Sequence, residues 1–392
     1  MGVATETEAG EAFADYLARV RAFTQEVLRP HEAALETELC VPEAIVAEMR
    51  ELGLFAITLP RDWGGLGWTM EEQVLLTMEF TQASAAYRAR FSTTIGLCAQ
   101  VVLDYGTEAQ KQRYLPEMAS GRITAAFALT EEEAGSDAGS LKTRAARAGN
   151  GYRIDGSKRY ITNAPDADLF VVMARTGAPQ DGHAGISVFL VERETPGVSV
   201  GAPEALMGQA GSRVAEIQFD DCRVPGDALL GGQEGNGLKI ALRGINHART
   251  HVAATAVGQA IRLIEEMVAY AKGREQFGQP IAEFQAVQTM IGESQAELSA
   301  ARALTLDVAR RFDAGPIPFT EIACAKLFAT EMVCRVADRA VQVLGGMGYM
   351  TKHAVSRLYR DVRLLRIYEG TSQIHQLNIA RRVLAEGGPI HG

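Results

Sequence analysis

The sequence predicts an α+β fold of three domains: an N-terminal helical domain (residues 1–124), a middle β-barrel or sandwich domain (125–235) and a C-terminal domain of four long helices (236–392). Apolar residues recur at helical spacing toward both ends of the chain and in short strand-like runs between them, which predicts the three blocks. The 392 residues suit two or three domains of about 150 residues each. Apolar residues make up 47% and charged residues 22%, as in ordinary globular proteins.

The first domain is predicted to consist of helices separated by proline and glycine breaks. Apolar residues from Phe13 to Val27 recur every three or four positions, as on one face of a helix. Pro42 and Gly53 bracket a second, shorter helix. After the turn-rich stretch 59–67, helical spacing continues through Leu115.

The middle domain is predicted to be built from short strands. Turn dipeptides such as Asn150-Gly151 and Pro196-Gly197 separate runs rich in β-branched and aromatic residues. Turns spaced roughly ten residues apart indicate a barrel or sandwich and not alternating βαβ units. The predicted strands are Ala125–Thr130, Tyr152–Ile154, Leu169–Ala174, Ile186–Val191 and Arg213–Phe219.

The last domain is predicted to be helical, with two long helices on either side of Gly315. Gly273 and the pair Gly345-Gly346 supply the other breaks. The final helix is expected to begin near Thr371, because apolar residues recur at helical spacing from that point.

Net charge and hydropathy disfavour several classes of protein. A formal charge of −9 argues against nucleic acid or an anionic membrane surface as the main partner. The longest uncharged run, Phe91–Leu103, is too short and too mixed to span a bilayer. The acidic N-terminus, MGVATETEAG, lacks an apolar core, so we expect neither a signal peptide nor a transit peptide, and a cytoplasmic location.

Cysteines and histidines do not predict a metal site. The five cysteines are scattered, with no CxxC pair. His247 and His251 are four residues apart but lack the Glu that follows the first histidine in zinc hydrolases. Such a pair is more often polar surface or ligand-facing than metal-binding, so we expect no metal.

Three further features could carry chemistry, and the residues alone leave each of them open. The glycine clusters 64–67, 231–237 and 345–348 match neither a dinucleotide-binding fingerprint nor a P-loop, and plain turns are their commoner interpretation. Glu369 is either a buried base with a raised pKa or an exposed residue before a capping Thr371. Arg274 either holds a pyrophosphate or lies near a helix C-terminus.

An ordered series of motifs resembles the acyl-CoA dehydrogenase family of FAD-dependent flavoproteins over residues 10–386. Each motif alone is weak, whereas their order along nearly the whole chain is highly specific. The series comprises Leu59-Pro60 with Gly64-Gly65 and Gly67, Gly106-Thr107-Glu108 with Tyr114-Leu115-Pro116, Phe127 to Glu131 with Gly135-Ser136-Asp137, Lys158 to Asn163, Arg274 to Gly278 with Phe284-Gln285, Gln342 to Gly346, and Tyr368 to Thr371.

The resemblance implies desaturation of an acyl-CoA thioester to the trans-2-enoyl-CoA. Glu369 would be the catalytic base that removes the α-proton, while noncovalent FAD accepts a hydride from the β-carbon. The backbone N–H of Glu369, with a cofactor hydroxyl, would polarise the thioester oxygen. The implied partners are an electron-transfer flavoprotein and further copies of the chain, in a homotetramer built as a dimer of dimers.

The resemblance also assigns binding residues. Positions that match FAD contacts are Phe127, Leu129, Thr130, Ser136, Tyr160, Thr162, Arg274, Gln276, Phe284, Gln285, Gln342, Gly345, Gly346, Thr371 and Gln373. Those from Arg274 to Gly346 are expected to hold FAD across a subunit boundary. Positions that match substrate contacts are Ser136, Asn246, Arg249, Tyr368 and Gly370.

The chain departs from the family pattern at three positions. Glu132 replaces the usual proline after Thr-Glu, Asn246 stands where many members have Asp, and Tyr160 replaces a tryptophan beside the flavin. The first departure affects the placement of that loop, and the second affects one contact on the CoA side. The third is an exchange of one aromatic residue for another.

The acyl group is the least determined part of the expected reaction. Tyr87-Arg88 with Phe91-Ser92 resembles the segment of glutaryl-CoA dehydrogenase whose arginine binds the distal carboxylate, which would make the substrate a dicarboxylic acyl-CoA. In the competing interpretation, Arg88 and Arg90 are surface residues at a helix start. Two different activities are also found on this fold: a flavin monooxygenase or oxidase, which often lacks the Glu of the Glu-Gly-Thr turn, and a dehydrogenase of carrier-protein thioesters.

Overall fold

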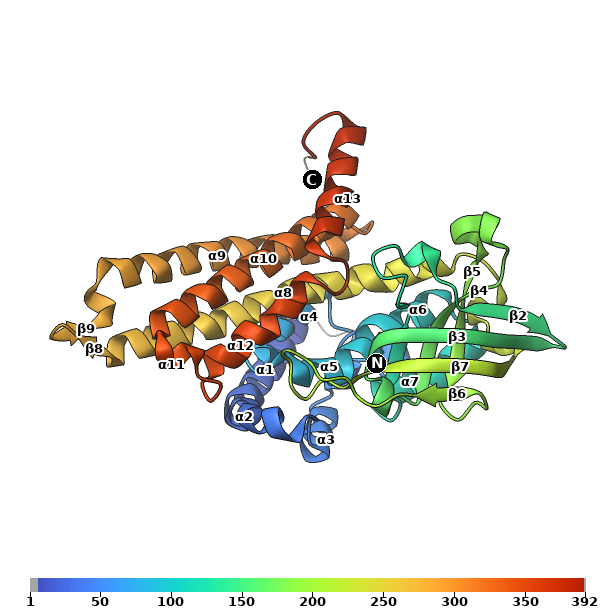
Figure 1. Cartoon of the computed structure of the whole chain (residues 1–392), viewed down its shortest axis with the longest axis horizontal. Coiled ribbons are helices and arrows are strands. Elements are labelled where there is room, and N and C mark those ends of the chain that lie inside the picture. Colours follow the sequence, from blue (N-terminus) through green and yellow to red (C-terminus); the bar gives the residue numbers. More distant parts are fainter. Residues whose placement is uncertain (1–5, 391–392) are drawn as a thin grey trace.

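The computed structural model describes residues 6–390 and is organised as helices, sheet and helices (Figure 1). The N-terminal helices are α1 (Glu6–Phe23), α2 (Arg29–Glu38), α3 (Glu43–Glu51), α4 (Met70–Phe80), α5 (Ala85–Thr93), α6 (Ala99–Tyr105) and α7 (Glu108–Ala119). Capping boxes fix two of their starts, at Thr69 before α4 and at Thr107 before α7. Residues 1–5 of the segment expected to lack a targeting signal lie outside the described range.

The middle domain is one seven-stranded sheet with the strand order β1-β4-β2-β3-β7-β6, in which β5 also pairs with β4. The strands are β1 (Ala125–Ala128), β2 (Arg144–Ala148), β3 (Gly151–Thr162), β4 (Leu169–Arg175), β5 (Ile186–Glu192), β6 (Val198–Val200) and β7 (Val214–Pro225). The β1–β4 pair is parallel, whereas β3–β7 and β4–β5 are antiparallel. The expected β-domain is confirmed. The sequence pattern missed β2 and β6 because both are short and largely outside the core.

The C-terminal domain is a helical bundle whose long helices run side by side (Figure 1). Its elements are α8 (Gly237–Gly273), the hairpin β8 (Glu275–Gln276) and β9 (Gln279–Pro280), α9 (Gln285–Ala314), α10 (Phe319–Leu344), α11 (Gly346–Tyr349), α12 (Ala354–Arg363) and α13 (Ser372–Glu386). The predicted glycine breaks end α8, α9 and α10, and Thr371 is the N-cap of α13, as expected. No helix within residues 6–390 is long and apolar enough to cross a membrane.

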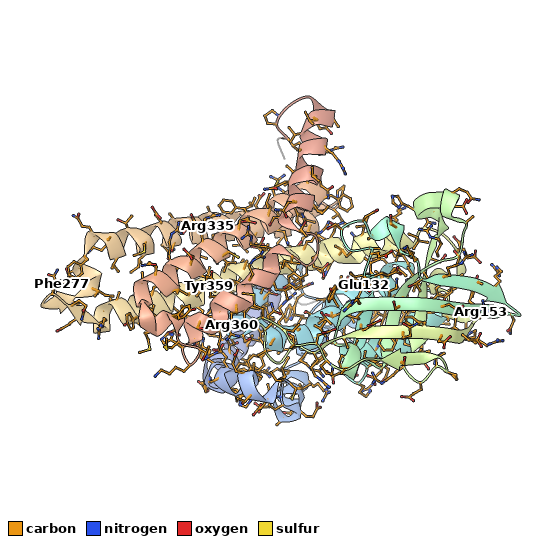
Figure 2. All side chains as sticks on the ribbon, in the orientation of Figure 1. Glu132, Arg153, Phe277, Arg335, Tyr359 and Arg360 are labelled. Carbon is orange, nitrogen blue, oxygen red and sulfur yellow. The ribbon has the colours of Figure 1, made fainter. Side chains whose placement is uncertain are left out.

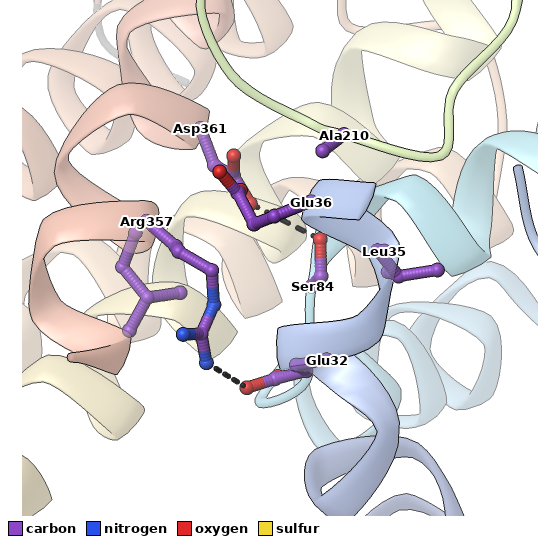
Figure 3. Close-up of a pocket in the computed structure, with 8 residues that line it drawn as sticks. Glu32, Leu35, Glu36, Ser84, Ala210, Arg357 and Asp361 are labelled. Atoms are coloured by element: carbon purple, nitrogen blue, oxygen red, sulfur yellow. Dashed lines mark hydrogen bonds and ion pairs between the residues drawn. The ribbon is translucent and has the colours of Figure 1, made fainter. Parts of the chain in front are cut away.

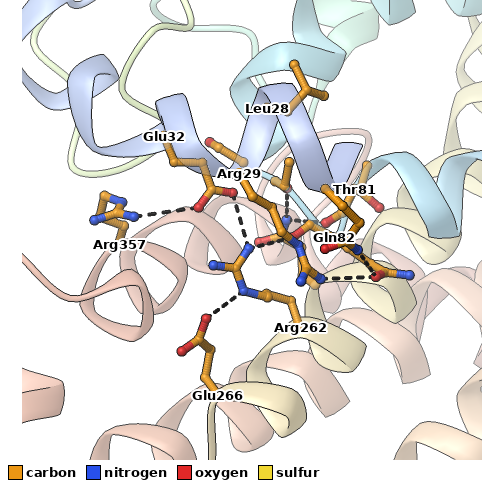
Figure 4. Close-up of polar contacts among 12 residues, drawn as sticks. Leu28, Arg29, Glu32, Thr81, Gln82, Arg262, Glu266 and Arg357 are labelled. Carbon is orange, nitrogen blue, oxygen red and sulfur yellow. Dashed lines mark hydrogen bonds and ion pairs between the residues drawn. The ribbon is translucent and has the colours of Figure 1, made fainter. Parts of the chain in front are cut away.

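Buried charges connect the N-terminal domain to the bundle. Glu32 of α2, only 3% exposed, faces Arg262 of α8 at 3.6 Å and Arg357 of α12 at 3.5 Å (Figure 4). Arg262 also pairs with Glu266, one turn along α8, at 2.7 Å. Because removing one member of a buried pair leaves an unpaired charge, these contacts fix how α2 lies on the bundle.

A second buried carboxylate lies where all three domains meet. Asp361 of α12 accepts the hydroxyl of Ser84, from the N-terminal domain, at 3.1 Å (Figure 3). The same carboxylate accepts the backbone N–H of Gln209, from the segment between β6 and β7. That segment forms part of the wall of the large cavity described next.

Candidate active site

A cavity of about 1150 Å³ is lined by residues of all three domains. A pocket for one drug-sized ligand measures about 300–1,000 Å³, so this cavity has room for more than one ligand. Of the predicted binding residues, those that line it are Arg88, Phe127, Leu129, Thr130, Ser136, Tyr160, Thr162, Asn246, Arg249, Tyr368, Glu369, Gly370 and Thr371. Residues far apart in the sequence therefore converge on one space.

Glu369 lies in a left-handed turn just before α13. Its φ is 54° and that of Gly370 is 97°. A non-glycine residue in this region costs about 1–2 kcal/mol, so the surroundings must hold the turn. Arg249 Nε donates to the carbonyl oxygen of Glu369 at 2.8 Å, and Lys326 Nζ donates to that of Gly370 at 2.8 Å.

The position after Glu369 strongly favours a glycine. A Cβ at Gly370 would lie 3.1 Å from Arg249 Nη2 and 3.1 Å from His375 Nε2, in addition to the strain of φ 97°. His375 is fully buried, and burial lowers its pKa to about 3, so the ring is neutral. The hydroxyl of Thr371 accepts the N–H of Ile374 at 3.3 Å and so starts α13 directly after the turn.

The electrostatics around Glu369 suit a base that works near neutral pH. Burial raises its pKa to about 7, whereas the positive charges of Arg249, Lys326 and Arg88 oppose that rise. A buried carboxyl that titrates near 7 is ionised for part of the population and binds a proton strongly. Glu369 is partly buried and lines the cavity, so the interpretation as an exposed residue is wrong, whereas its role as a base stays a prediction.

The β-domain side of the cavity is held by a buried ion pair. Lys158 of β3 is fully buried, and its Nζ donates to Glu131 at 2.7 Å and to the carbonyl oxygen of Leu129 at 3.1 Å. Glu131 also accepts the N–H of Thr143 at 3.0 Å. These contacts order the segment that includes Leu129 and Thr130, which were predicted to contact the flavin.

Arg88 and Arg90 are in different surroundings although both belong to α5. Arg90 pairs with Asp166 at 2.8 Å. Arg88 lines the cavity, where the titratable groups that act on it are the Tyr368 phenol and the Glu369 carboxyl. The interpretation of Arg88 as a surface residue is therefore wrong, because α5 turns this side chain inward.

The three departures from the family pattern also line the cavity. Glu132 pairs with Arg159 at 2.8 Å. The side-chain oxygen Oδ1 of Asn246 accepts a hydrogen bond from Arg249 Nη1 at 2.8 Å, so it helps to orient that arginine. Tyr160 has a φ of 58° and is 62% exposed.

Eight predicted cofactor residues lie away from this cavity. Gln373 is on the exposed side of α13. The others are near the β8–β9 hairpin and the C-terminal end of α10. Helix α10 has 26 residues and is therefore about 39 Å long, and its N-terminal end lies at the cavity. The residues near the hairpin and the C-terminal end are Arg274, Gln276, Phe284, Gln285, Gln342, Gly345 and Gly346. Their neighbour Phe277 is 95% exposed (Figure 2), so this end of the bundle presents an apolar side chain to its surroundings.

The histidine pair is not at the surface. His247 and His251 are buried with ring centroids 5.0 Å apart, and His251 contacts Thr77 Oγ1 at 3.0 Å and Gln73 Oε1 at 3.2 Å. The expectation of a polar surface pair is wrong, because Thr77 and Gln73 of α4 cover His251. His247 lines a smaller cavity of about 150 Å³, so a ligand-facing role stays a prediction. Within the described range, no group of three or more His, Cys, Asp or Glu could hold a metal ion.

The motifs missed two residues of the site. Lys326 lies within a buried stripe of α10 that includes Ile322 and Ala329, and a lysine in such a stripe is the signal that could have identified it. Gln209 lines the cavity in a left-handed conformation with φ 54°. Nothing in its local sequence marks it.

Family models of the three acyl-CoA dehydrogenase domains match the chain in order: the N-terminal domain over residues 10–122, the middle domain over 126–222 and the C-terminal domain over 235–384. The chain belongs to the acyl-CoA dehydrogenase family. It is an oxidoreductase that acts on acyl-CoA, in a family that depends on FAD.

Individual relatives resemble nearly the whole chain. Acryloyl-CoA reductase (NADH) of Anaerotignum propionicum is 41% identical over 93% of this chain and 92% of its own. A chain in a structure of the electron transferring flavoprotein of Acidaminococcus fermentans is 35% identical, with a TM-score of 0.92 over 98% of this chain and 100% of its own. A glutaryl-CoA dehydrogenase from Mycobacterium smegmatis in complex with FADH2 is 28% identical, with a TM-score of 0.90 over 96% and 95%.

The residues of the cavity fit the cofactor that acyl-CoA dehydrogenases use. Phe127 and Leu129 offer an apolar wall, and the exposed ring of Tyr160 offers an aromatic face. Hydroxyl groups of Thr130 and Thr162 line the same space. The hydroxyl of Ser212, also in the wall, is buried without a hydrogen-bond partner among the described residues, as expected of a wall built to meet a polar ligand.

Proposed function

We propose that this chain is an FAD-dependent acyl-CoA dehydrogenase that desaturates an acyl-CoA thioester between its α- and β-carbons, giving the trans-2-enoyl-CoA. The observation that carries the proposal is Glu369, a carboxyl whose pKa burial raises to about 7 and which lines a cavity large enough for a cofactor and a substrate together. Such a group is suited to removing the weakly acidic proton next to a thioester.

The roles of the chain's own residues follow from their positions. The carboxylate of Glu369 takes the α-proton. The backbone N–H of Glu369 is the donor to the thioester oxygen, where negative charge develops as that proton leaves. Arg249 orients the turn through the Glu369 carbonyl, and Tyr368 and Gly370 lie next to the base on the substrate side.

Bound FAD supplies the acceptor for the hydride that leaves the β-carbon. Phe127, Leu129, Thr130, Ser136, Tyr160, Thr162 and Thr371 would hold it from within the chain. The seven predicted positions at the far end of the bundle would reach the cofactor of a neighbouring subunit in a homotetramer. They are Arg274, Gln276, Phe284, Gln285, Gln342, Gly345 and Gly346. Family resemblance and the similarity to the Acidaminococcus fermentans chain support an electron-transfer flavoprotein as the electron acceptor.

Anaerobic mixing of the purified yellow protein with acyl-CoA thioesters tests the proposal. Butyryl-CoA, isovaleryl-CoA and glutaryl-CoA provide straight, branched and dicarboxylic chains. Loss of the flavin absorbance near its visible maximum is expected with at least one of them, with the enoyl-CoA as product. If none of them reduces the flavin, the proposed function is wrong.

A dicarboxylic acyl-CoA is the second candidate substrate, and Arg88 favours it. Its guanidinium lines the cavity near Glu369, and among the described residues no carboxylate forms an ion pair with it within 4.0 Å. A cation in such surroundings gains most from an anionic partner, which the distal carboxylate of a glutaryl-like chain would supply. Ser92 and Gln209 add polar groups to the same wall.

A further inference from the structure

Lys326 is a fully buried lysine that donates a hydrogen bond into the turn of the catalytic base. Its Nζ lies 2.8 Å from the carbonyl oxygen of Gly370. Three neighbours of Lys326 on α10, Ile322, Ala329 and Thr330, are buried as well. The ammonium is therefore not part of a solvent-exposed helix face. A buried charge is costly, and it persists where its contacts depend on it.

The hydrogen bond from Lys326 stabilises a turn with an unfavourable backbone conformation. Glu369 and Gly370 both have positive φ values, and the carbonyl oxygens of both are held by cations from the bundle, Arg249 on α8 and Lys326 on α10. Helices α8 and α10 thereby donate hydrogen bonds to two consecutive peptide groups of the turn. A turn held at both carbonyls can keep a fixed carboxylate direction although its own backbone conformation is unfavourable.

The charges around the ammonium are mixed. Glu369 and Glu331 attract it, and Arg249 repels it. His375 of α13 lies on the other side of the turn as a neutral ring, because burial and the charges of Arg249 and Lys326 keep its pKa near 3. Burial lowers the pKa of Lys326 itself to about 8, so at neutral pH most of the population is still a cation.

We propose that Lys326 is a positioning residue for the dehydrogenation: through the Gly370 carbonyl it holds the Glu369–Gly370 turn, and its positive charge favours the ionised, basic form of Glu369. The inference rests on the proposed role of Glu369 as the base. Lys326 does not touch the substrate. It acts through the two neighbouring residues of the turn.

Two substitutions separate the hydrogen bond from the charge. Lys326→Met removes both at similar length, and Lys326→Gln keeps a donor for the Gly370 carbonyl but no charge. Removing an opposite charge raises a carboxyl pKa, so in both variants the rise of the flavin-reduction rate with pH should move upward by about one pH unit. At pH 7 this alone lowers the rate about fivefold. The Met variant should also lose part of its rate on the high-pH plateau, which the Gln variant keeps.

Thr330→Val is the matched control on the same helix. The Thr330 hydroxyl is buried and bonds to the carbonyl oxygen of Lys326 at 2.8 Å, so its loss perturbs the packing of α10 but leaves the cation. The midpoint of its pH profile should equal that of the wild type. An equal midpoint shift in Thr330→Val would assign the effect to packing and overturn the proposal.

A titration without substrate provides an independent readout on the holoprotein. The infrared band of the protonated Glu369 carboxyl, identified as the difference between the wild type and Glu369→Gln, reports its ionisation against pH. The midpoint should be higher in both Lys326 variants, and an unchanged midpoint overturns the proposal. Because no acyl-CoA is needed, this measurement judges Lys326 even if the wild type oxidises none of the thioesters, a result that would refute only the proposed function.

Discussion

Arg249 Nε donates a hydrogen bond to the backbone carbonyl oxygen of Glu369 across 2.8 Å, and not to its carboxylate. The three cations near that carboxylate act on it by charge alone, without a side-chain hydrogen bond to it from the described residues. The arginine therefore fixes the backbone of the turn, whereas the carboxylate keeps its lone pairs for a proton. This division leaves the carboxylate free to accept a proton although cations surround it, as the proposed role of base requires.

Glu369→Gln should retain FAD and lose the reaction. The amide has the shape of the carboxyl but cannot take a proton, and a general base contributes about 10²–10⁴-fold. The rate of anaerobic flavin reduction should fall by at least about a hundredfold, with the yellow colour unchanged. The control is Glu386→Gln, on the exposed end of the same helix, which should react like the wild type. Turnover by Glu369→Gln would refute the assignment of the base.

The rate of flavin reduction should increase with pH through a midpoint of about 7. Burial raises the pKa of Glu369 to that value, and only the carboxylate can accept the α-proton, so activity is lost on the acid side. Below the midpoint the rate should fall about tenfold per pH unit. Stopped-flow traces with saturating acyl-CoA check this. A midpoint near 4.5, the ordinary value for glutamate, would show that the site does not desolvate the group.

Arg88→Met should separate dicarboxylic from simple acyl chains. A hydrogen bond between a buried guanidinium and a carboxylate contributes about 1.5–3 kcal/mol, so kcat/KM for glutaryl-CoA should fall about 10–100-fold. The value for butyryl-CoA should hold or rise. Arg90→Met, which breaks the pair with Asp166 on the same helix, is the control and should not change the preference. Equal losses with both thioesters would remove the dicarboxylate hypothesis.

Lys158→Met should destabilise the wall next to the cofactor. The substitution leaves the Glu131 carboxylate buried without its partner at 2.7 Å, which costs about 3–5 kcal/mol. Denaturant unfolding should show the loss, and FAD should dissociate more readily. Combining it with Glu131→Gln removes the unpaired charge and should restore part of the stability. If the double variant is as unstable as the sum of the single ones, the two residues are not coupled.

Hydrophobic periodicity and helix-capping residues predicted most of the fold. The conformations and neighbours of the site residues depend on contacts between distant elements and could not be predicted in this way. The start of α13 was predictable because Thr371 is both a good N-cap and the first residue before an apolar helical stripe. The short strand β6 has too few residues for a period to show. The left-handed φ of Glu369 could not be read from its residue type, because the contacts that impose it come from α8 and α10.

Packing by elements distant in the sequence also explains where the surroundings of polar side chains differ from the sequence-based predictions. Arg88 and Arg90 are two residues apart on one helix, and only the position of the bundle and the sheet decides which of them faces the cavity and which pairs with Asp166. The same holds for His251, which contacts Thr77 of α4. A polar residue on a helix therefore cannot be assigned to surface or site before its neighbours are known.

Asp361→Asn should change how stability depends on pH. Burial raises the pKa of Asp361 to about 6, from 3.8, although Gln209 and Ser84 donate hydrogen bonds to its charged form. The folded protein thus binds this proton more tightly than the unfolded chain, so the contribution to stability is full below about pH 3.8 and is lost as the pH rises through 6.

The comparison with the asparagine variant isolates this one group, because other titrating residues are common to both proteins. Between about pH 5 and pH 7 the wild type should lose about 1 kcal/mol of unfolding free energy relative to Asp361→Asn. Denaturant unfolding of both proteins at each pH measures the difference. Ser84→Ala removes a hydrogen bond to the carboxylate, so it should raise the pKa of Asp361 further and move the same loss to higher pH. Parallel pH profiles for the wild type and Asp361→Asn would mean that this carboxyl is ionised throughout, and that the junction of the three domains carries a buried charge even at pH 5.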